Sequence, residues 1–256
     1  MKITMLGTGT SCGVPFIGCH CPVCLSEDPK DKRCRSSILI EKGNTKVVID
    51  TGYEFRLQCL RSGVERLDGV LYTHAHPDHL FGLDDLRAFY REEKSVDIWG
   101  SKGTIDRIKT LYPYVFKPFS NDGLPHLSPH IASQGVPFLV GEIEFIPFFM
   151  THGPVESTGY RFGNCAYVTD VSDIREEENL KYLENLDVLI IDALMEKKHP
   201  SHLSFIEACE IGKKCGAKRV YFTHISHTMK HVDIERKYNG IAKPSYDTMT
   251  VEVDDE

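Results

Sequence analysis

Short hydrophobic runs, many of them rich in β-branched residues, alternate along this chain with segments whose hydrophobic residues recur at helical spacing. Runs of this length bounded by Gly, Asn, Asp or Ser are typical of β-strands. The runs that predict strands are Lys2–Leu6, Ser37–Glu41, Lys46–Ile49, Gly69–Tyr72, Asp97–Trp99, Glu142–Phe149, Gly159–Phe162, Ala166–Thr169, Val188–Ile191 and Val220–Thr223.

Helical spacing of the hydrophobic positions predicts helices between these strands. The early strands read as a hairpin through Lys42-Gly43-Asn44, and the alternation of Met249, Val251 and Val253 predicts a last strand. Strands that are followed by helices favour an α/β protein with mixed sheets covered by helices. The predicted helices are Phe55–Ser62, Asp84–Arg91, Thr104–Tyr112, Glu177–Leu183 and Ser204–Cys215.

The chain has no repeat and no Pro- or Ser-rich linker, so we expect one domain over residues 1–256. Within it, Gly82–Pro137 is expected to be an insertion that forms the substrate wall. Arg87 is a candidate phosphate contact there, although a solvated helix face is the favoured interpretation. The aromatic residues of Tyr112–Phe119 suggest a homodimer interface. The sequence assigns no role to residues from Lys230 onward.

Composition narrows the cellular setting and the partners. Hydrophobic residues make up 41% and charged residues 26% of the chain, as in ordinary globular proteins. The absence of an apolar run of about 18 residues argues against a membrane span, and the first residues resemble a strand more than a signal peptide. We therefore expect a cytoplasmic protein. The net charge of −7 argues against nucleic acid as the main partner, but a small anionic substrate bound at a metal site is compatible with it.

Candidate metal ligands follow four of the predicted strands. In α/β folds, ligands bind beyond the ends of strands, where loops converge over a rigid sheet. Four such positions therefore indicate one shared site. The pairs that end the strand-like runs are Thr73-His74, Thr151-His152, Thr169-Asp170 and Thr223-His224.

The segment His74–His79 has the pattern H-x-H-x-D-H, with Asp78 as its aspartate. Alternating His74 and His76 can face one metal ion from an extended segment, while Asp78 and His79 lie at a turn into a helix. Imidazole and carboxylate together bind Zn²⁺, Mn²⁺ or Fe²⁺. Asp170 could bridge two such ions at the ~3.5–4 Å spacing of two-metal hydrolases. The pattern thus predicts a dinuclear metal site.

The nine cysteines are more consistent with thiols or metal ligands than with a disulfide framework. Six of them are scattered and are expected to pack in the core. Cys19, Cys21 and Cys24 cluster instead, and three thiolates are one ligand short of a tetrahedral zinc site. His20 and Cys34 are possible fourth ligands, and a metal-free cluster of reduced cysteines is the alternative.

The motifs resemble the metallo-β-lactamase superfamily. The resemblance rests on the segment Thr73–His79, on Val48-Ile49-Asp50-Thr51-Gly52, and on the later His152, Asp170 and His224. It extends from Leu6-Gly7-Thr8-Gly9 to Thr223-His224-Ile225-Ser226-His227, which is nearly the whole chain. It is strongest for the branch that contains the phosphoribosyl cyclic phosphate phosphodiesterases (PhnP-type proteins), because of Cys19–Cys24, Ser201-His202-Leu203-Ser204 and the T-H-I-S-H segment.

The resemblance implies an αβ/βα four-layer sandwich with two mixed sheets and a site at one edge of them. It also implies that Asp50 orients a ligand histidine, whereas the residues alone fit a strand-end turn equally well. The implied ligands of one metal are His74, His76, His152 and Asp170; those of the second are Asp78, His79, Asp170 and His224; and those of a structural zinc are Cys19, Cys21, Cys24 and His227.

The activity implied is hydrolysis of a small, cyclic phosphodiester by a hydroxide that bridges two Zn²⁺ or Mn²⁺ ions, with Asp78 and His202 as catalytic residues. His202 would serve the leaving group, with His199 as a rival and helix capping as the simpler role. A tRNA 3′-processing nuclease or a thiolester hydrolase are alternative enzymes with the same motif. The non-enzyme alternative is a zinc-stapled binding protein. Such a protein needs one metal ion per chain instead of about three.

Overall fold

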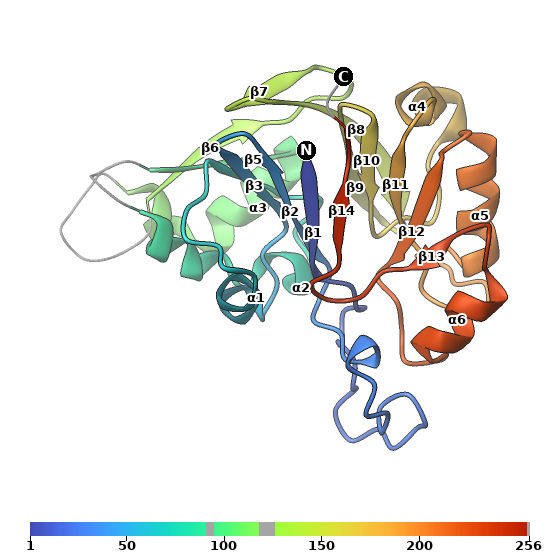
Figure 1. Ribbon diagram of the computed structural model, residues 1–256. Helices are drawn as coiled ribbons and strands as arrows, with labels where there is room; N and C mark the ends of the chain where they lie inside the picture. Colours follow the sequence, from blue (N-terminus) through green and yellow to red (C-terminus); the bar gives the residue numbers. More distant parts are fainter. Residues whose placement is uncertain (91–94, 118–125, 255–256) are drawn as a thin grey trace.

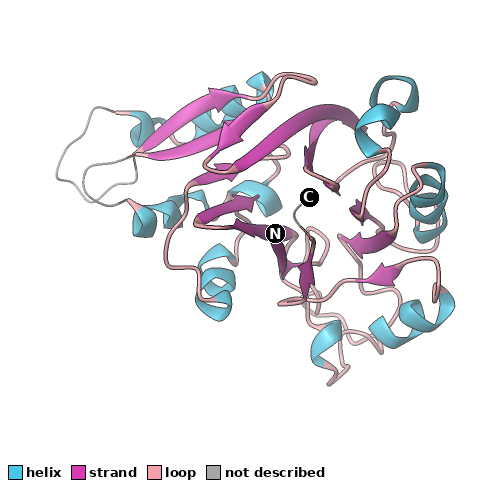
Figure 2. Cartoon of the chain, turned by 45° about the horizontal axis from the view of Figure 1, so that its top comes forward, coloured by secondary structure: helices cyan, strands magenta, loops and turns pink. Residues whose placement is uncertain are grey.

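The part of the chain that the computed structural model describes, residues 1–90, 95–117 and 126–254, forms two seven-stranded sheets packed face to face (Figure 1). Helices cover both outer faces, so the layers run helix, sheet, sheet, helix (Figure 2). The expected α/β sandwich with two mixed sheets is confirmed.

The first sheet holds the N-terminal half of the chain and one strand from its end. The hairpin of β2 (Ser37–Lys42) and β3 (Thr45–Ile49) is present, and its turn contains Gly43 at φ 53°. Pairing is antiparallel from β14 to β3 and parallel from β3 to β6. The sheet order is β14 (Thr250–Glu252), β1 (Lys2–Gly7), β2, β3, β4 (Gly69–Leu71), β5 (Val96–Gly100) and β6 (Leu127–Ile131).

The second sheet repeats this organisation with the C-terminal half. Strands β10 to β13 are parallel, whereas β7 to β10 pair in an antiparallel manner. The sheet order is β13 (Lys243–Pro244), β12 (Arg219–Thr223), β11 (Val188–Asp192), β10 (Cys165–Val168), β9 (Val155–Phe162), β8 (Ile143–His152) and β7 (Phe138–Val140).

Alternation along the strands divides the core into three layers. Successive side chains of a strand point to opposite faces. On β10, Tyr167 packs between the two sheets with Ile3 and Ile190, while Ala166 and Val168 pack against the helices of the second sheet. Because β10 is buried on both faces, its sequence is a continuous hydrophobic run, as parallel strands covered on both sides require.

The helices fit between the strands in chain order. The predicted Ser204–Cys215 helix is α5 (Phe205–Lys214), whose start is fixed by a capping box between Ser204 and Glu207. The helices that cover the first sheet are α1 (Phe55–Ser62), α2 (Pro77–Leu80), the 3₁₀ helices Leu83–Phe89 and Pro113–Phe116, and α3 (Lys102–Leu111); those on the second are α4 (Glu176–Leu183), α5 and α6 (His231–Lys237). A further 3₁₀ turn, Pro29–Asp31, lies in the N-terminal loop.

The segment Gly82–Pro137 contributes β5, α3 and β6 to the first sheet and its covering layer. Tyr112, Tyr114 and Phe116 pack partly against the buried cluster beneath α3. Phe119, the remaining aromatic residue of the suggested interface, lies outside the described residues, as does Arg91. Within the described ranges, no helix is long and apolar enough to cross a lipid bilayer.

Candidate metal centres

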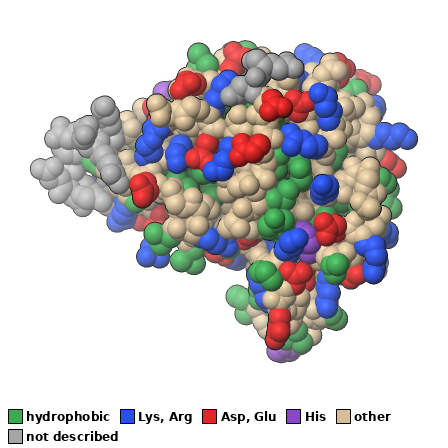
Figure 3. All heavy atoms as spheres, in the orientation of Figure 1, with side chains coloured by type: hydrophobic (Ala, Val, Ile, Leu, Met, Phe, Trp, Pro, Cys, Tyr) green, Lys and Arg blue, Asp and Glu red, His purple; other side chains and the backbone are tan. Residues whose placement is uncertain are grey.

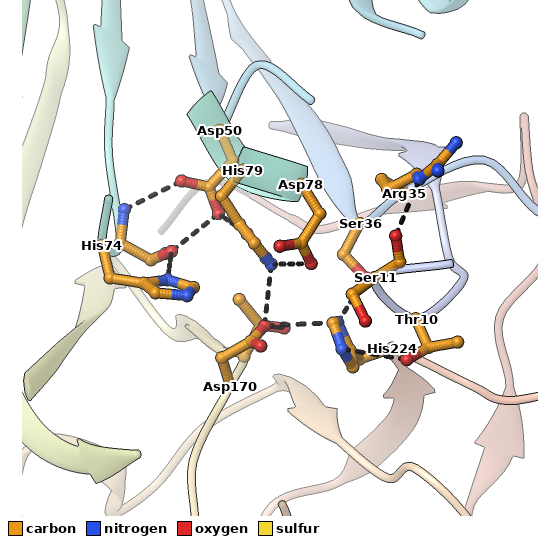
Figure 4. Close-up of polar contacts among 12 residues, drawn as sticks. Thr10, Ser11, Arg35, Ser36, Asp50, His74, Asp78, His79, Asp170 and His224 are labelled. Atoms are coloured by element: carbon orange, nitrogen blue, oxygen red, sulfur yellow. Dashed lines mark hydrogen bonds and ion pairs between the residues drawn. The ribbon is translucent and has the colours of Figure 1, made fainter. Parts of the chain in front are cut away.

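The histidines and aspartates predicted from the strand ends lie together at one edge of the two sheets. His74 follows β4, His152 ends β8, Asp170 follows β10 and His224 follows β12. In Figure 4 the side chains of His74, Asp78, His79, Asp170 and His224 are labelled. Side chains far apart in the sequence therefore meet because parallel strands end at the same edge of a sheet.

The first cluster consists of three histidines. The ring of His74 lies 4.4 Å from that of His76 and 5.2 Å from that of His152, centroid to centroid. One ligand atom from each ring falls within 4.8 Å of the others. His74 Nε2 is buried and has no hydrogen-bond partner in the part of the chain that the structure describes. A buried polar atom without a partner is costly, and a metal ion would satisfy it.

The second cluster combines two carboxylates with two histidines. His79 Nε2 lies 3.0 Å from Asp170 Oδ2 and 3.2 Å from Asp78 Oδ2. The same Asp170 oxygen lies 3.2 Å from His224 Nδ1. All four residues are buried. Mixed imidazole and carboxylate donors of this kind suit borderline divalent cations.

Asp170 connects the two clusters. Its Oδ2 faces His79 and His224, while its Oδ1 lies 3.7 Å from His152 Nε2 in the three-histidine cluster. One carboxylate therefore presents one oxygen to each cluster, which is the arrangement of a bridging ligand in two-metal sites. The residues present fit a pair of neighbouring divalent metal ions.

Burial and charge set the protonation states of these groups. Burial lowers the pKa of His74, His76 and His224, which favours the neutral imidazole that binds metal. Burial also disfavours a charge on His79, but the surrounding Asp170, Asp78 and Asp50 carboxylates outweigh it and raise the pKa of His79 well above its usual value. The carboxylates around the His79 ring concentrate negative charge there, and bound metal cations would balance it.

Asp50 holds His79 and the first histidine segment in place. Its Oδ2 lies 2.7 Å from His79 Nδ1, and its two oxygens accept hydrogen bonds of 2.8 Å from the backbone N–H and the hydroxyl of Thr73. The contact with His79 is that of a carboxylate orienting a ligand histidine. His152 is fixed in the same way, because its Nδ1 donates to the carbonyl oxygen of Ser201 at 2.7 Å.

Three of these residues have left-handed backbone conformations. The φ angles are 66° at Asp50, 54° at Asp170 and 58° at His224. Non-glycine residues adopt this region rarely, Asp and His more readily than most. Residues held in it cluster at functional sites, where the surrounding structure overrides the local strain. The backbone thus turns sharply after three strands to aim side chains at one point.

A further pair lies beside both clusters. His202 Nδ1 lies 3.0 Å from Asp192 Oδ2 and 3.9 Å from Asp170 Oδ1. Burial disfavours the imidazolium, but the hydrogen bond to Asp192 and the charges of Asp192 and Asp170 raise the pKa of His202 to about 9. His199, the rival from the sequence, contacts Ser201 instead. Asp192 was missed, although it also ends a strand-like run, Val188–Ile191, as Asp50 does.

The cysteine cluster lies in a loop that projects from the sheets (Figure 1). His227 Nδ1 is 3.5 Å from Cys19 Sγ, 3.4 Å from Cys21 Sγ and 3.5 Å from Cys24 Sγ. A tetrahedral zinc ion with ordinary Zn–S and Zn–N bonds separates sulfur from nitrogen by about 3.5 Å. The backbone N–H of Cys24 and the contact with His227 lower the pKa of Cys21 to about 6, which favours its thiolate.

The rival fourth ligands do not join this group. His20 points to solvent as an exposed residue, and Cys34 is bonded through its backbone N–H to Asp247 Oδ2 at 2.8 Å. Of the candidates weighed from the sequence, the structure therefore brings His227 to the three cysteines. The ring of Phe16 stacks on that of His227 at 5.6 Å and covers one side of the site.

Known proteins share this fold. The β-lactamase superfamily domain matches residues 45–225. The crystal structure of a new diphosphatase from the PhnP family is 37% identical, with a TM-score of 0.90 over 98% of this chain and 97% of that one. Zinc-bound PqqB from Methylobacterium extorquens is 16% identical, with a TM-score of 0.81 over 99% and 100% of the two chains, so it supports the fold alone.

An octanoyltransferase from Porphyromonas gingivalis is 35% identical over the full length of this chain. The chain spans 52% of that relative's length, so the name describes a protein about twice as long. The domain match, the PhnP-family structure and the two ligand clusters agree with one another. The chain therefore belongs to the metallo-β-lactamase superfamily.

Proposed function

We propose that this protein is a dinuclear metal-dependent hydrolase that cleaves a P–O bond in a small phosphodiester or diphosphate. The proposed metals are two Zn²⁺ or Mn²⁺ ions in the His/Asp clusters and one structural zinc at the Cys19 loop. The observation that carries the proposal is the position of Asp170, which offers one oxygen to each of the two buried ligand clusters.

Two divalent ions at this site would acidify a water molecule and neutralise charge on the phosphoryl oxygens. The side chains around them hold the geometry. Asp50 keeps His79 in one tautomer, and the Ser201 carbonyl does the same for His152. All of the ligands except His76 are buried, which strengthens the charge interactions among them.

His202 is proposed to protonate the leaving group. Its Nδ1–H is held by Asp192, so its Nε2 is the atom left to carry the transferable proton. In the reaction, water gives up one proton to solvent and its oxygen bonds to phosphorus, while the P–O bond to the leaving group breaks. The leaving oxygen takes the proton from His202, which regains a proton from solvent. Asp192 is a positioning residue in this step.

Surface charge and the relatives support a small substrate. On the face shown in Figure 3, Lys and Arg side chains are interspersed with Asp and Glu, and the chain carries a net charge of −7. A polyanion such as tRNA binds best to a continuous basic surface. The diphosphatase of the PhnP family, at 37% identity, supports cleavage at phosphorus over cleavage of a thiolester.

The proposal is tested by elemental analysis of the purified chain together with an assay on bis(p-nitrophenyl) phosphate. We expect about three metal ions per chain and hydrolysis that a chelator stops and Mn²⁺ or Zn²⁺ restores. One tightly held zinc per chain and no metal-stimulated hydrolysis would contradict it and favour the binding protein. Faster cleavage of a precursor tRNA or of a thiolester would favour the alternative enzymes.

Replacing His202 with Ala should affect substrates according to their leaving groups. An alkoxide needs a proton as it departs, whereas p-nitrophenolate leaves without one. We therefore expect kcat to fall by about 10²-fold for a methyl-type diester and by much less for bis(p-nitrophenyl) phosphate. Asp192→Asn should give a weaker form of the same pattern. His199→Ala is the matched control, and equal losses on both substrates would refute the role of an acid.

A further inference from the structure

A cavity of about 450 Å³ opens beside the three-histidine cluster. Its volume lies within the range of sites that hold small molecules. The metal ligand His76 and its neighbour Pro77 line the cavity, as do Thr104, Arg107 and Leu111 of α3. A substrate whose reacting phosphorus lies at the clusters would have this cavity as room for the rest of the molecule.

One wall of the cavity is aromatic. Phe81 lines it and is 40% exposed. The Phe81 ring is held by edge contacts with Tyr53 at 5.7 Å and Tyr112 at 6.5 Å, centroid to centroid. A fixed and partly exposed ring offers a face for an apolar or aromatic group of a ligand. The cavity is therefore suited to bind the organic part of a phosphoester in place of water.

Arg107 supplies the positive charge in this lining. Among the described residues, its side chain has no ion pair and no hydrogen bond. Glu156 lines the same cavity but is paired with Arg175, at 3.5 Å between Oε2 and Nη1. The carboxylate in the lining is therefore paired with Arg175, and none of the described residues forms an ion pair with Arg107.

Arg87, the phosphate contact considered from the sequence, differs from Arg107 both in its ion pairing and in its position. Its guanidinium pairs with Asp84, and it lines a separate hollow with Phe55 and Cys59. It is thus committed to a surface ion pair away from the metal ligands, which agrees with the solvated helix face favoured above. Of these two arginines, Arg107 is the one that lines the cavity beside the metal ligands.

We propose that this cavity binds the non-reacting part of the substrate and that Arg107 pairs with a second anionic group there. The inference rests on the proposed function and narrows its substrate class. The favoured substrate is a phosphoester or diphosphate with an aromatic or apolar body and a second phosphate or carboxylate. A guanidinium can bind such a group with two parallel hydrogen bonds, which gives it selectivity as well as attraction.

The test compares two nitrophenyl esters that differ by one anion. Thymidine 5′-(p-nitrophenyl phosphate) carries no second anion, and its 3′-phosphorylated form carries one. The wild-type protein should have the lower KM for the 3′-phosphorylated ester. Arg107→Gln should raise that KM by about tenfold and change the KM for the other ester by less than about twofold. Because both esters release the same group, kcat should change little.

Lys109→Gln is the matched control, since Lys109 is an exposed cation on the same helix that does not line the cavity. Equal KM values for the two esters in the wild type, or an equal effect of Arg107→Gln on both, would overturn the inference while leaving the proposed function intact. Failure of the metal-loaded wild type to hydrolyse either ester would instead overturn the proposed function. If Arg107→Gln kept the full difference in KM between the two esters, another residue would bind the second anion, and the role of Arg107 would be overturned.

Discussion

Asp170→Asn is expected to lower kcat for bis(p-nitrophenyl) phosphate by about 10³-fold or more and to reduce the metal content of the His/Asp clusters. The replacement keeps the shape of the side chain but removes the charge that lies 3.0 Å from His79 Nε2 and 3.2 Å from His224 Nδ1. A bridging ligand contributes to both ions, so its loss should remove several kcal/mol of transition-state stabilisation, and about 4 kcal/mol corresponds to 10³-fold.

The fold should survive this replacement. Asn adopts left-handed backbone as readily as Asp, so the φ of 54° at position 170 is no obstacle. Asp173→Asn is the control, because Asp173 is an exposed residue of the same loop whose Oδ1 accepts a hydrogen bond from the Arg175 N–H, as an amide oxygen can. Kinetics and elemental analysis on both variants are the measurements. Full activity in Asp170→Asn with unchanged metal content would rule out the bridging role.

His227→Ala is expected to release one zinc ion per chain and to lower the melting temperature by on the order of 10 °C. Loss of a structural metal is among the few single changes that cost roughly 4 kcal/mol or more, and for a chain of this size each kcal/mol shifts the melting temperature by about 2–4 °C. Activity should also fall in part, because Thr10, from the same N-terminal segment, contacts His224 at 3.3 Å.

The neighbouring His20 provides the matched control for His227. His20 lies between Cys19 and Cys21 but is exposed and outside the ligand group. His20→Ala should keep its zinc and its melting temperature. The measurements are zinc content and thermal unfolding. If His20→Ala lost zinc and His227→Ala kept it, the fourth ligand would be misassigned.

The site could be anticipated from the sequence because its ligands are concentrated at strand ends. The H-x-H-x-D-H segment is local, and His152, Asp170 and His224 each follow a strand-like run that hydrophobic periodicity detects. Where a strand ends in parallel β-structure, its next residue points to a common edge, so linear spacing predicts proximity there. The ten strand-like runs found by this periodicity all correspond to strands of the structure, β1 to β5 and β8 to β12, and needed no tertiary information.

The features that were missed depend on tertiary contacts or on weak patterns. Strand β6 contains Pro129 and two exposed residues at its end, and a proline is tolerated there because β6 is an edge strand. Strand β13 has two residues, Lys243 and Pro244, too few for any periodicity. The helix α6 arose in a segment to which no role was assigned, and the importance of Asp192 depends on the approach of His202 from another element.

The cavity beside His76 could not be read from the sequence for a related reason. Its walls come from α2, α3 and the start of β9, and each contributes only a few residues. Arg107 carries no sequence signal that separates it from Arg87, since both lie on helical segments with other charged residues nearby. What distinguishes them is whether a carboxylate happens to lie within reach, and this is a property of the folded chain.

The proximity of the cysteine loop and His227 also bears on how the protein is made. Cys21 and its histidine partner are 206 residues apart, and β1 likewise pairs with β14 near the other end of the chain. At a translation rate of about 5–20 residues per second, the three thiols would emerge roughly 10 to 40 s before their fourth ligand. During that interval a nascent chain would present an incomplete zinc site, open to oxidation or to the wrong metal. Whether the site binds zinc correctly would thus depend on the time between synthesis of the cysteines and synthesis of His227, as well as on the affinity of the complete site.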